Sequence, residues 1–397
     1  MKISLLEQRE DFEAIFLESF ERFCRSYFGH SVPSQIGKKG RLRFRQNAEL
    51  NIIYPERMSP EALAQLTAEF RYHERAHRHV LQSLYCLISI ARGTRRLLSK
   101  PMFSVDDETD RLQNWIFLPG NHSIRIVDIK NENCIVFPKI GFEHGFFLND
   151  ALARERYEYL HVPKVLGIAT DQGWYTEERI SALPLTRFGD PELESRVFGQ
   201  AVGDLVRLRA ETLEPSSLGD VFDKTHALAR QMVQNLGTLP DSVKNRLEEM
   251  LERCVTLTAA GRTVSLPTCV THGDFQPGNL LTDGSDFWLI DWEYFGRRSI
   301  CYDFFTWTLK ARHSLGLGER LESAVAAQKS AAPVDIWGCA QNGDLRALIA
   351  LFLAEDLIVK LQEIRSPGIT NKTRSLGPWL NEVLPFLARH ENRSLNA

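Results

Sequence analysis

The sequence predicts an α+β protein, because a stretch with strand periodicity lies between two stretches with helical periodicity along its 397 residues. Residues 1–112 carry apolar side chains mostly at the helical spacings of three and four. Residues 113–180 carry short runs rich in Ile, Val and Phe between turns, which indicates an antiparallel sheet. Residues 181–397 return to helical periodicity. We therefore expect a mainly helical N-terminal extension, a sheet lobe and a larger helical lobe.

Two helices are expected in the extension. The first is amphipathic and runs from Leu6 to about Phe28. The second begins at Ser59, which can cap the free backbone amides, and Pro60 suits the first helical position. Apolar positions over residues 63–91 then form one stripe, which we expect to pack on the first helix or on the sheet lobe. A basic stretch at 38–45 separates the two helices, with a short strand near residues 50–54.

The expected sheet begins at Trp115 and continues as strands separated by turns to residue 139. A helix is expected from Asn149 to Tyr159, and two further strands follow before residue 180. The last lobe is helical, except for a block from Cys269 to Asp291.

The composition excludes some classes of function. The 48 Lys and Arg nearly balance the 51 Asp and Glu, so no global charge attracts the protein to nucleic acid. Seven scattered cysteines without a C-x-x-C spacing favour reduced thiols, and no segment has the roughly 20 apolar residues of a transmembrane helix. The first residues also lack the features of a secretory signal, so we expect a cytoplasmic protein.

One loop carries residues suited to phosphoryl transfer. It reads HGDFQPGN over residues 272–279, and a second segment reads IDWE over 290–293. Phosphoryl transfer needs a carboxylate near the attacking hydroxyl group and oxygen ligands for magnesium. Asp274 and Asn279 lie five residues apart across the loop, and Asp291 ends an apolar strand that can form a hairpin with the residues after Asn279. These oxygen-bearing side chains are therefore expected to converge.

The two motifs resemble those of the aminoglycoside phosphotransferase and choline kinase family, a branch of the bilobal protein-kinase-like fold. The resemblance implies that ATP and Mg²⁺ are the cofactors and that the small sheet lobe binds the nucleotide. It implies that Asp274 is the catalytic base and that Asn279 and Asp291 are the magnesium ligands. It also implies that His272 is a scaffold of the catalytic loop and that Asp303 helps to support this loop.

The same resemblance, which covers residues 113–310 most clearly, assigns residues to the nucleotide. The turn at Gly120, Asn121 and Ser123 would cover the phosphates, and Lys139 would contact them. The ion-pair partner expected for Lys139 is Glu155, with Glu158 as the alternative one turn further along. Adenine would bind the backbone of the linker that contains Glu178 and Ile180.

The acceptor is expected to be a small molecule with a hydroxyl group. Trp292, Glu293 and Tyr294 are candidates to line its pocket, because an aromatic ring and a carboxylate suit a cationic group. They equally suit a sugar, so an aminoglycoside, an amino alcohol and a sugar or glycan all stay open. The N-terminal extension can dock an acceptor or another subunit.

Two other functions fit parts of the sequence. Residues 73–77 read HERAH, which places His73 and His77 on one helix face for zinc with Glu74 as the base of a hydrolase. Neighbouring arginines oppose a dication there, and no third ligand is evident. The other alternative is a catalytically silent binding module of the kinase-like fold, although all the expected catalytic residues are present.

Overall fold

A computed structural model describes residues 2–37, 40–71, 76–106, 111–328 and 344–394. The chain forms two compact units. Unit 1 comprises Met1–Ala201 and Pro277–Glu293, and unit 2 comprises Val202–Gln276 and Tyr294–Ala397. Unit 1 combines a large antiparallel sheet with several helices, and unit 2 is mainly helical, which confirms the predicted α+β class.

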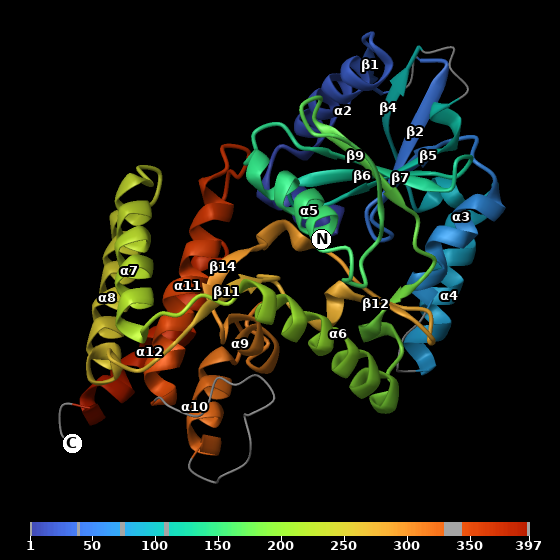
Figure 1. Cartoon of the computed structure of the whole chain (residues 1–397). Coiled ribbons are helices and arrows are strands. Elements are labelled where there is room, and N and C mark those ends of the chain that lie inside the picture. Colours follow the sequence, from blue (N-terminus) through green and yellow to red (C-terminus); the bar gives the residue numbers. More distant parts are fainter. Residues whose placement is uncertain (1, 38–39, 72–75, 107–110, 329–343, 395–397) are drawn as a thin grey trace. The chain divides into compact units, whose positions relative to one another are not determined.

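Unit 1 is built on a nine-stranded sheet with the order β1-β4-β2-β3-β5-β6-β7-β9-β8 (Figure 1). Every neighbouring pair is antiparallel. The strands are β1 (Ser34–Ile36), β2 (Leu42–Asn47), β3 (Ile52–Pro55), β4 (Lys100–Val105), β5 (Trp115–Pro119), β6 (Ser123–Asp128), β7 (Asn133–Pro138), β8 (Val165–Ala169) and β9 (Trp174–Glu178). Four of these strands lie before residue 113, so the N-terminal segment extends the sheet in addition to contributing helices.

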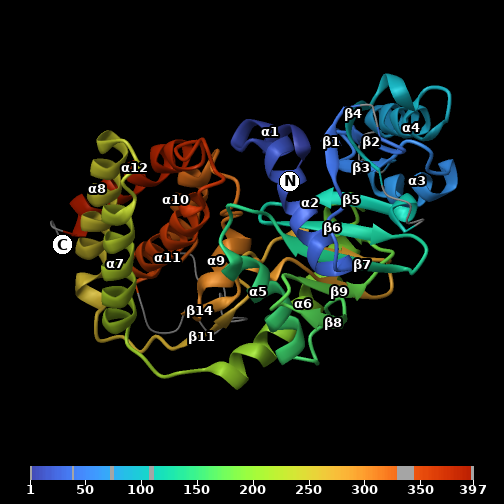
Figure 2. The same cartoon turned by 90° about the horizontal axis from the view of Figure 1, so that it is seen from above.

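Helices α1 (Ile3–Arg9) and α2 (Phe12–Phe28) begin the chain, and α2 packs on the sheet (Figure 2). The predicted apolar face of α2 supplies Phe16, Phe20 and Phe23, all buried. Phe23 stacks on Phe137 of β7 with ring centroids 4.4 Å apart, and Phe16 meets Phe117 of β5 edge to face. Burial of such large rings stabilises this core strongly.

The second predicted helix is interrupted. Ser59 caps α3 (Pro60–Thr67) as expected, its hydroxyl accepting from the Ala62 amide at 3.2 Å, but a 3₁₀ turn (η1, Ala68–Arg71) follows before α4 (Ala76–Ile90). The interruption changes the helical phase, so the prediction of one buried stripe was wrong. In α4 the buried side contains Cys86 and Ile90, whereas Val80, Leu84 and Leu87 of the stripe are exposed.

Helix α5 (His144–Arg156) lies on the opposite face of β7 from α2 and replaces the helix predicted over residues 149–159. A small antiparallel sheet completes unit 1, formed by β10 (Leu183–Pro184), β12 (Leu280–Thr282) and β13 (Phe287–Leu289). The pairing of β12 with β13 is the predicted hairpin, in which Leu280 faces Leu289. Its ends carry Asn279 and Asp291.

Unit 2 contains a group of long helices beside a two-stranded sheet of β11 (Thr268–Thr271) and β14 (Gly296–Ser299). Figure 2 shows α7, α8, α11 and α12 packed side by side. The helices after α5 are α6 (Pro191–Thr212), which crosses from unit 1 into unit 2, α7 (Leu218–Asn235), α8 (Asp241–Thr258), α9 (Tyr302–Thr308), α10 (Leu317–Gln328), α11 (Leu345–Arg365) and α12 (Leu376–Ser394).

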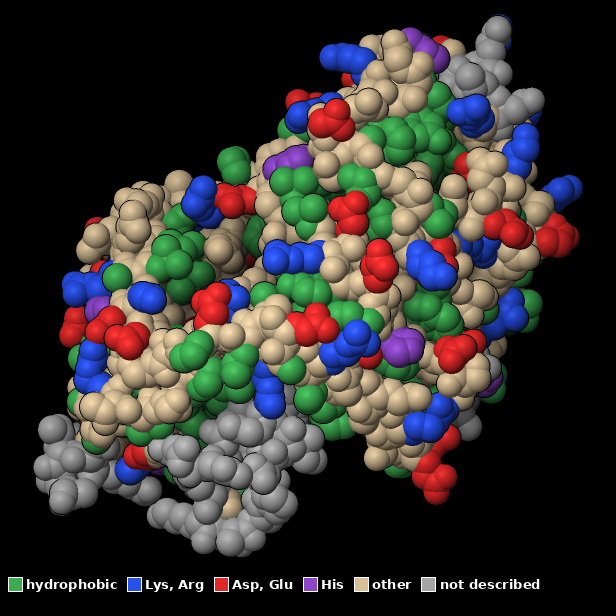
Figure 3. Space-filling model, viewed as in Figure 1, with side chains coloured by type: hydrophobic (Ala, Val, Ile, Leu, Met, Phe, Trp, Pro, Cys, Tyr) green, Lys and Arg blue, Asp and Glu red, His purple; other side chains and the backbone are tan. Residues whose placement is uncertain are grey.

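Charged side chains of both signs are interspersed on the face drawn in Figure 3, as the balanced composition predicts. Among the described helices, none has the length and apolar character needed to cross a bilayer.

Candidate active site

The loop that carries Asp274 starts at the end of β11 and depends on Gly273. Gly273 has φ +86°, a conformation that side chains disfavour. A Cβ atom there would overlap the backbone carbonyl of Tyr294. The HGD sequence therefore needs its glycine for steric reasons, and the tight turn fixes the direction in which Asp274 leaves the loop.

Asp303 of α9 binds the backbone of this loop. Its Oδ2 accepts from the His272 amide at 2.8 Å and its Oδ1 accepts from the Gly273 amide at 2.9 Å. The His272 ring is buried, and its Nδ1 accepts from the Asp274 amide at 3.1 Å. Burial raises the pKa of the Asp303 carboxyl above its ordinary value, although the His272 ring and the two amides act to lower it.

Both carboxylate oxygens of Asp274 have partners within unit 2. Oδ1 pairs with Nε of Arg312 at 2.5 Å, and Oδ2 accepts from the Gln276 side chain at 2.8 Å. Arg312 also donates to the Gly273 carbonyl and to Asp356 of α11, each at 2.5 Å. Arg312 and Asp356 had no recognisable signal in the sequence, because they lie 38 and 82 residues beyond Asp274 in a helical region.

Asn279 and Asp291 lie together in unit 1. The hairpin continues one step past β12, where the Ile290 amide donates to the Asn279 carbonyl at 2.9 Å. Asp291 has φ +70°, a strained conformation for a residue other than glycine, of the kind that accumulates at functional sites. A carboxylate and an amide oxygen at one hairpin end fit the oxygen ligands that Mg²⁺ prefers. The described residues contain no cluster of three His, Cys, Asp or Glu side chains suited to a metal.

The turn expected to cover phosphates is fixed from two sides. The Gly120 amide donates to the Ser123 carbonyl at 2.9 Å, which closes the hairpin between β5 and β6. Arg9 of α1 donates to the Asn121 carbonyl at 2.7 Å. The buried His122 ring contacts Glu293 through Nδ1 at 2.6 Å and stacks on Phe146, with ring centroids 4.0 Å apart.

Lys139 does not pair with the predicted glutamates. Its ammonium group pairs with Glu10, both side chains having 0% exposed surface, and it lies 3.3 Å from the Asn121 carbonyl. Glu155 and Glu158 are exposed, and Glu155 faces outward on α5. The prediction was wrong because Lys139 pairs with Glu10, which lies between α1 and α2, whereas α2 and α5 pack on opposite faces of β7. Burial lowers the pKa of Lys139 to about 8, although Glu10 acts to raise it.

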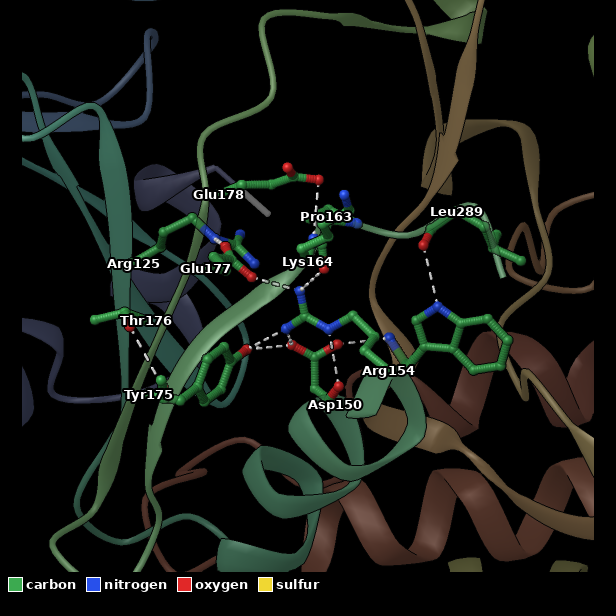
Figure 4. Close-up of polar contacts among 12 residues, drawn as sticks. Arg125, Asp150, Arg154, Pro163, Lys164, Tyr175, Thr176, Glu177, Glu178 and Leu289 are labelled. Atoms are coloured by element: carbon green, nitrogen blue, oxygen red, sulfur yellow. Dashed lines mark hydrogen bonds and ion pairs between the residues drawn. The ribbon is translucent and has the colours of Figure 1, made fainter. Parts of the chain in front are cut away.

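A buried polar network occupies the α5 side of the sheet (Figure 4). Arg154 of α5 donates to Asp150 at 2.8 Å and to Glu177 of β9 at 2.5 Å. Glu177 also accepts from Arg125 of β6 at 2.6 Å, and Asp150 accepts from the Trp292 amide at 3.0 Å. Burial alone would raise the pKa of Asp150, but Arg154 and the other donors hold it below its ordinary value. Sequence reasoning missed this network, although Arg154 directly precedes Glu155.

The remaining predicted residues lie in unit 1, except Tyr294. Glu178 ends β9, where its amide donates to the Lys164 carbonyl at 2.9 Å, and Ile180 lies in the irregular segment before β10. Trp292 is fully buried and its indole N–H donates to the Leu289 carbonyl at 3.0 Å, so the ring has no open face for an acceptor. His73 and Glu74 of the possible zinc motif lie outside the described residues.

A comparison with protein families decides the relationship. The family model described as the phosphotransferase enzyme family matches residues 134–351, more than half of the chain. The chain belongs to this family. As a phosphotransferase it is expected to have the catalytic loop within the matched region, and residues 272–279 lie there.

Solved structures similar to this phosphotransferase have low sequence identity. A choline/ethanolamine kinase family protein from Mesorhizobium loti is 17% identical, with 73% of this chain and 95% of that chain covered and a TM-score of 0.44. An aminoglycoside phosphotransferase, APH(4)-Ia, solved with ADP and hygromycin B, is 14% identical over 70% and 93% of the two chains, with a TM-score of 0.43. The choline kinase LicA from Streptococcus pneumoniae is 15% identical over 71% and 91%, with a TM-score of 0.39. The comparison with curated proteins gave no match.

Proposed function

We propose that this phosphotransferase transfers the γ-phosphoryl group of ATP to a hydroxyl group of a small molecule, with Asp274 as the base. The observation that carries the proposal is the construction of the Asp274 loop. Gly273 sets its turn, Asp303 binds two of its amides, and Arg312 and Gln276 orient the carboxylate. Such preorganisation is what a positioned proton acceptor requires.

In this proposal Asp274 orients the acceptor hydroxyl and receives its proton as the oxygen attacks phosphorus. Asn279 and Asp291 would hold Mg²⁺, which when bound supplies positive charge to the phosphate oxygens. The turn at Gly120, Asn121 and Ser123 would cover the phosphates, and the backbone from Glu178 to Ile180 would bind adenine.

Three classes of acceptor are proposed, namely a sugar or glycan, an aminoglycoside and an amino alcohol. Of the predicted pocket residues, Glu293 is bound to His122 and Trp292 is buried, so their side chains support the fold of unit 1. Tyr294 lies in unit 2 beside Gly273 and remains the predicted contact for an acceptor. We place the enzyme in the cytoplasm, because all six described cysteines are free thiols.

One observation favours the alternative of a catalytically silent binding module. The lysine expected to contact phosphates is enclosed with Glu10, which leaves its charge neutralised within the fold. A module of this kind would bind a nucleotide or small molecule without transferring a phosphoryl group.

The test is an ATP-consumption screen of the purified wild type across aminoglycosides, amino alcohols, sugars and glycans in the presence of Mg²⁺. The proposal predicts acceptor-dependent ADP release and a phosphorylated product that mass spectrometry detects. Asp291→Ala is expected to weaken Mg-ATP binding as well as turnover. Nucleotide binding without transfer to any acceptor would support the silent module instead.

A further inference from the structure

The family resemblance assigns the phosphate contact to Lys139, which directly follows β7. The surroundings of Lys139 differ from those of Arg125 on the neighbouring strand β6. The ammonium group of Lys139 is surrounded by protein groups. It pairs with Glu10, contacts the Asn121 carbonyl, and lies 4.8 Å from the centroid of the Phe142 ring. For Lys139 to reach a phosphate, the buried carboxylate of Glu10 would have to lose this partner. Breaking a buried ion pair is strongly unfavourable.

Arg125 has the opposite environment. Its side chain is 35% exposed, and its Nε donates to Glu177 at 2.6 Å. Within the described part of the chain, its two terminal nitrogens, Nη1 and Nη2, bond to no other residue. The neighbouring Arg154 differs, since its side chain is 2% exposed and all three of its nitrogens donate to protein oxygens. The Nε atom of Arg125 is therefore held by Glu177, and its two terminal nitrogens are available to a ligand.

The position of Arg125 also suits phosphate. It lies on β6 two residues beyond Ser123, directly after the turn that the proposed function places over the phosphates. A guanidinium group with two unpaired terminal nitrogens can donate two parallel hydrogen bonds to phosphate oxygens.

The network joins Arg125 to the proposed magnesium site through bonds within unit 1. Glu177 accepts from Arg125 through one oxygen and from Arg154 through the other. Arg154 donates to Asp150, which accepts from the amide of Trp292, the residue after Asp291. Figure 4 shows these side chains in one continuous chain of contacts. The network therefore connects the guanidinium group of Arg125 with the backbone amide that follows Asp291.

We propose that Arg125, oriented by Glu177 and Arg154, binds the phosphate oxygens of the nucleotide in place of Lys139, whose pair with Glu10 stabilises the N-terminal helix on the sheet. This inference rests on the proposed nucleotide-dependent transfer and names the residue that provides the phosphate contact. Arg154, Glu177 and Asp150 are positioning residues, because they act through Arg125 and Trp292.

The test measures dissociation constants of the full chain for Mg-ADP and for adenosine by isothermal titration calorimetry. Arg125→Gln is expected to raise the Kd for Mg-ADP by about 10- to 100-fold, the range for loss of a hydrogen bond to a charged group. Adenosine lacks phosphates, so its Kd is expected to stay within about 2-fold. Arg125→Lys should recover part of the Mg-ADP affinity, because it keeps the charge and loses the fork.

The matched control is Arg43→Gln, an exposed arginine on β2 of the same sheet, which should leave both constants unchanged. The alternative phosphate contact, Lys139, is tested in the double variant Glu10→Gln/Lys139→Met. This variant removes both charges of the buried pair, so neither is left without its partner. An unchanged Mg-ADP constant in Arg125→Gln, an equal loss for adenosine, or a larger loss in the double variant would each overturn the inference. A wild type that fails to bind Mg-ADP would contradict the proposed function itself.

Discussion

Replacement of Arg312 by glutamine tests two roles of this residue, namely the stabilisation of unit 2 and the orientation of Asp274. Arg312 bonds to Asp274, Asp356 and the Gly273 carbonyl, and the Asp356 side chain has 0% exposed surface. Burial alone would raise the pKa of Asp356, but Lys360 and Arg312 hold it below its ordinary value. After the substitution, the only cation left beside Asp356 in the described chain is Lys360, at 3.4 Å.

The magnitude follows from the burial of this pair. Removing one partner of a buried ion pair costs about 3–5 kcal/mol, because the other charge stays desolvated. The lower half of this range applies here, since Lys360 remains and the Arg312 side chain is 17% exposed. We therefore expect Arg312→Gln to lower the free energy of unfolding by about 3 kcal/mol. The double variant Arg312→Gln/Asp356→Asn should recover part of this loss, because it removes the buried Asp356 carboxylate that Arg312 no longer compensates.

The assay is urea unfolding of the wild type, both single variants and the double variant, combined with turnover measurements. Stability should recover in the double variant, whereas kcat should stay low, because Asp274 still lacks its arginine. A loss below about 1 kcal/mol in Arg312→Gln would refute the energetic argument, since that is the size expected for an exposed pair. Recovery of kcat together with stability would refute the orienting role.

Three further variants test separate parts of the structure. Gly273→Ala should lower the free energy of unfolding by about 2–4 kcal/mol, because Gly273 has a positive φ and an added Cβ atom would overlap Tyr294. The control Gly278→Ala, in the same loop, has free space for the Cβ atom and should change this free energy by less than about 1 kcal/mol. Similar urea midpoints for the two variants would argue against strain at Gly273. Burial raises the pKa of Glu355 from 4.5 to about 7, so its contribution to stability is complete below pH 4.5 and is lost as the pH rises through about 7. Glu355→Gln should remove this slope, worth about 3 kcal/mol in unfolding measured across that window, and an unchanged slope would exclude Glu355 as its source. Phe16→Ala removes a ring from the core between α2 and the sheet and should lower the free energy of unfolding by about 3–5 kcal/mol. The control Leu97→Ala, at a residue that is 79% exposed, should lower it by less than about 0.5 kcal/mol. Equal losses would show that α2 contributes little to the core.

Local signals in the sequence were sufficient for the parts of the site that are close in the chain. The hairpin of β12 and β13 and the cap at Ser59 follow from residue types and spacing over fewer than about fifteen residues. The α+β class follows from periodicity alone.

Long-range pairs were not accessible in this way. Glu10 lies 129 residues before Lys139, and Arg125 lies 52 residues before Glu177. Nothing in either local sequence distinguishes these partners from ordinary charged residues on a helix or strand. Arg154 and Glu155 show the difficulty, because adjacent residues on α5 point into the network and into solvent respectively, and only the packing of the helix decides which. The prediction that the apolar stripe on α4 is buried was wrong for the same reason, because the face that α4 buries depends on the turn before it.

The turnover of Asp274→Asn shows whether the Asp274 carboxylate is the catalytic base. The acceptor is the one found in the screen, and the matched control is Asp286→Asn, an exposed aspartate in the turn between β12 and β13. Loss of a general base predicts a fall in kcat of about 10²- to 10⁴-fold in Asp274→Asn, with the Kd for Mg-ADP within about 3-fold of the wild type and Asp286→Asn fully active. A kcat within about 2-fold of the wild type in Asp274→Asn would contradict the assignment of Asp274 as the base.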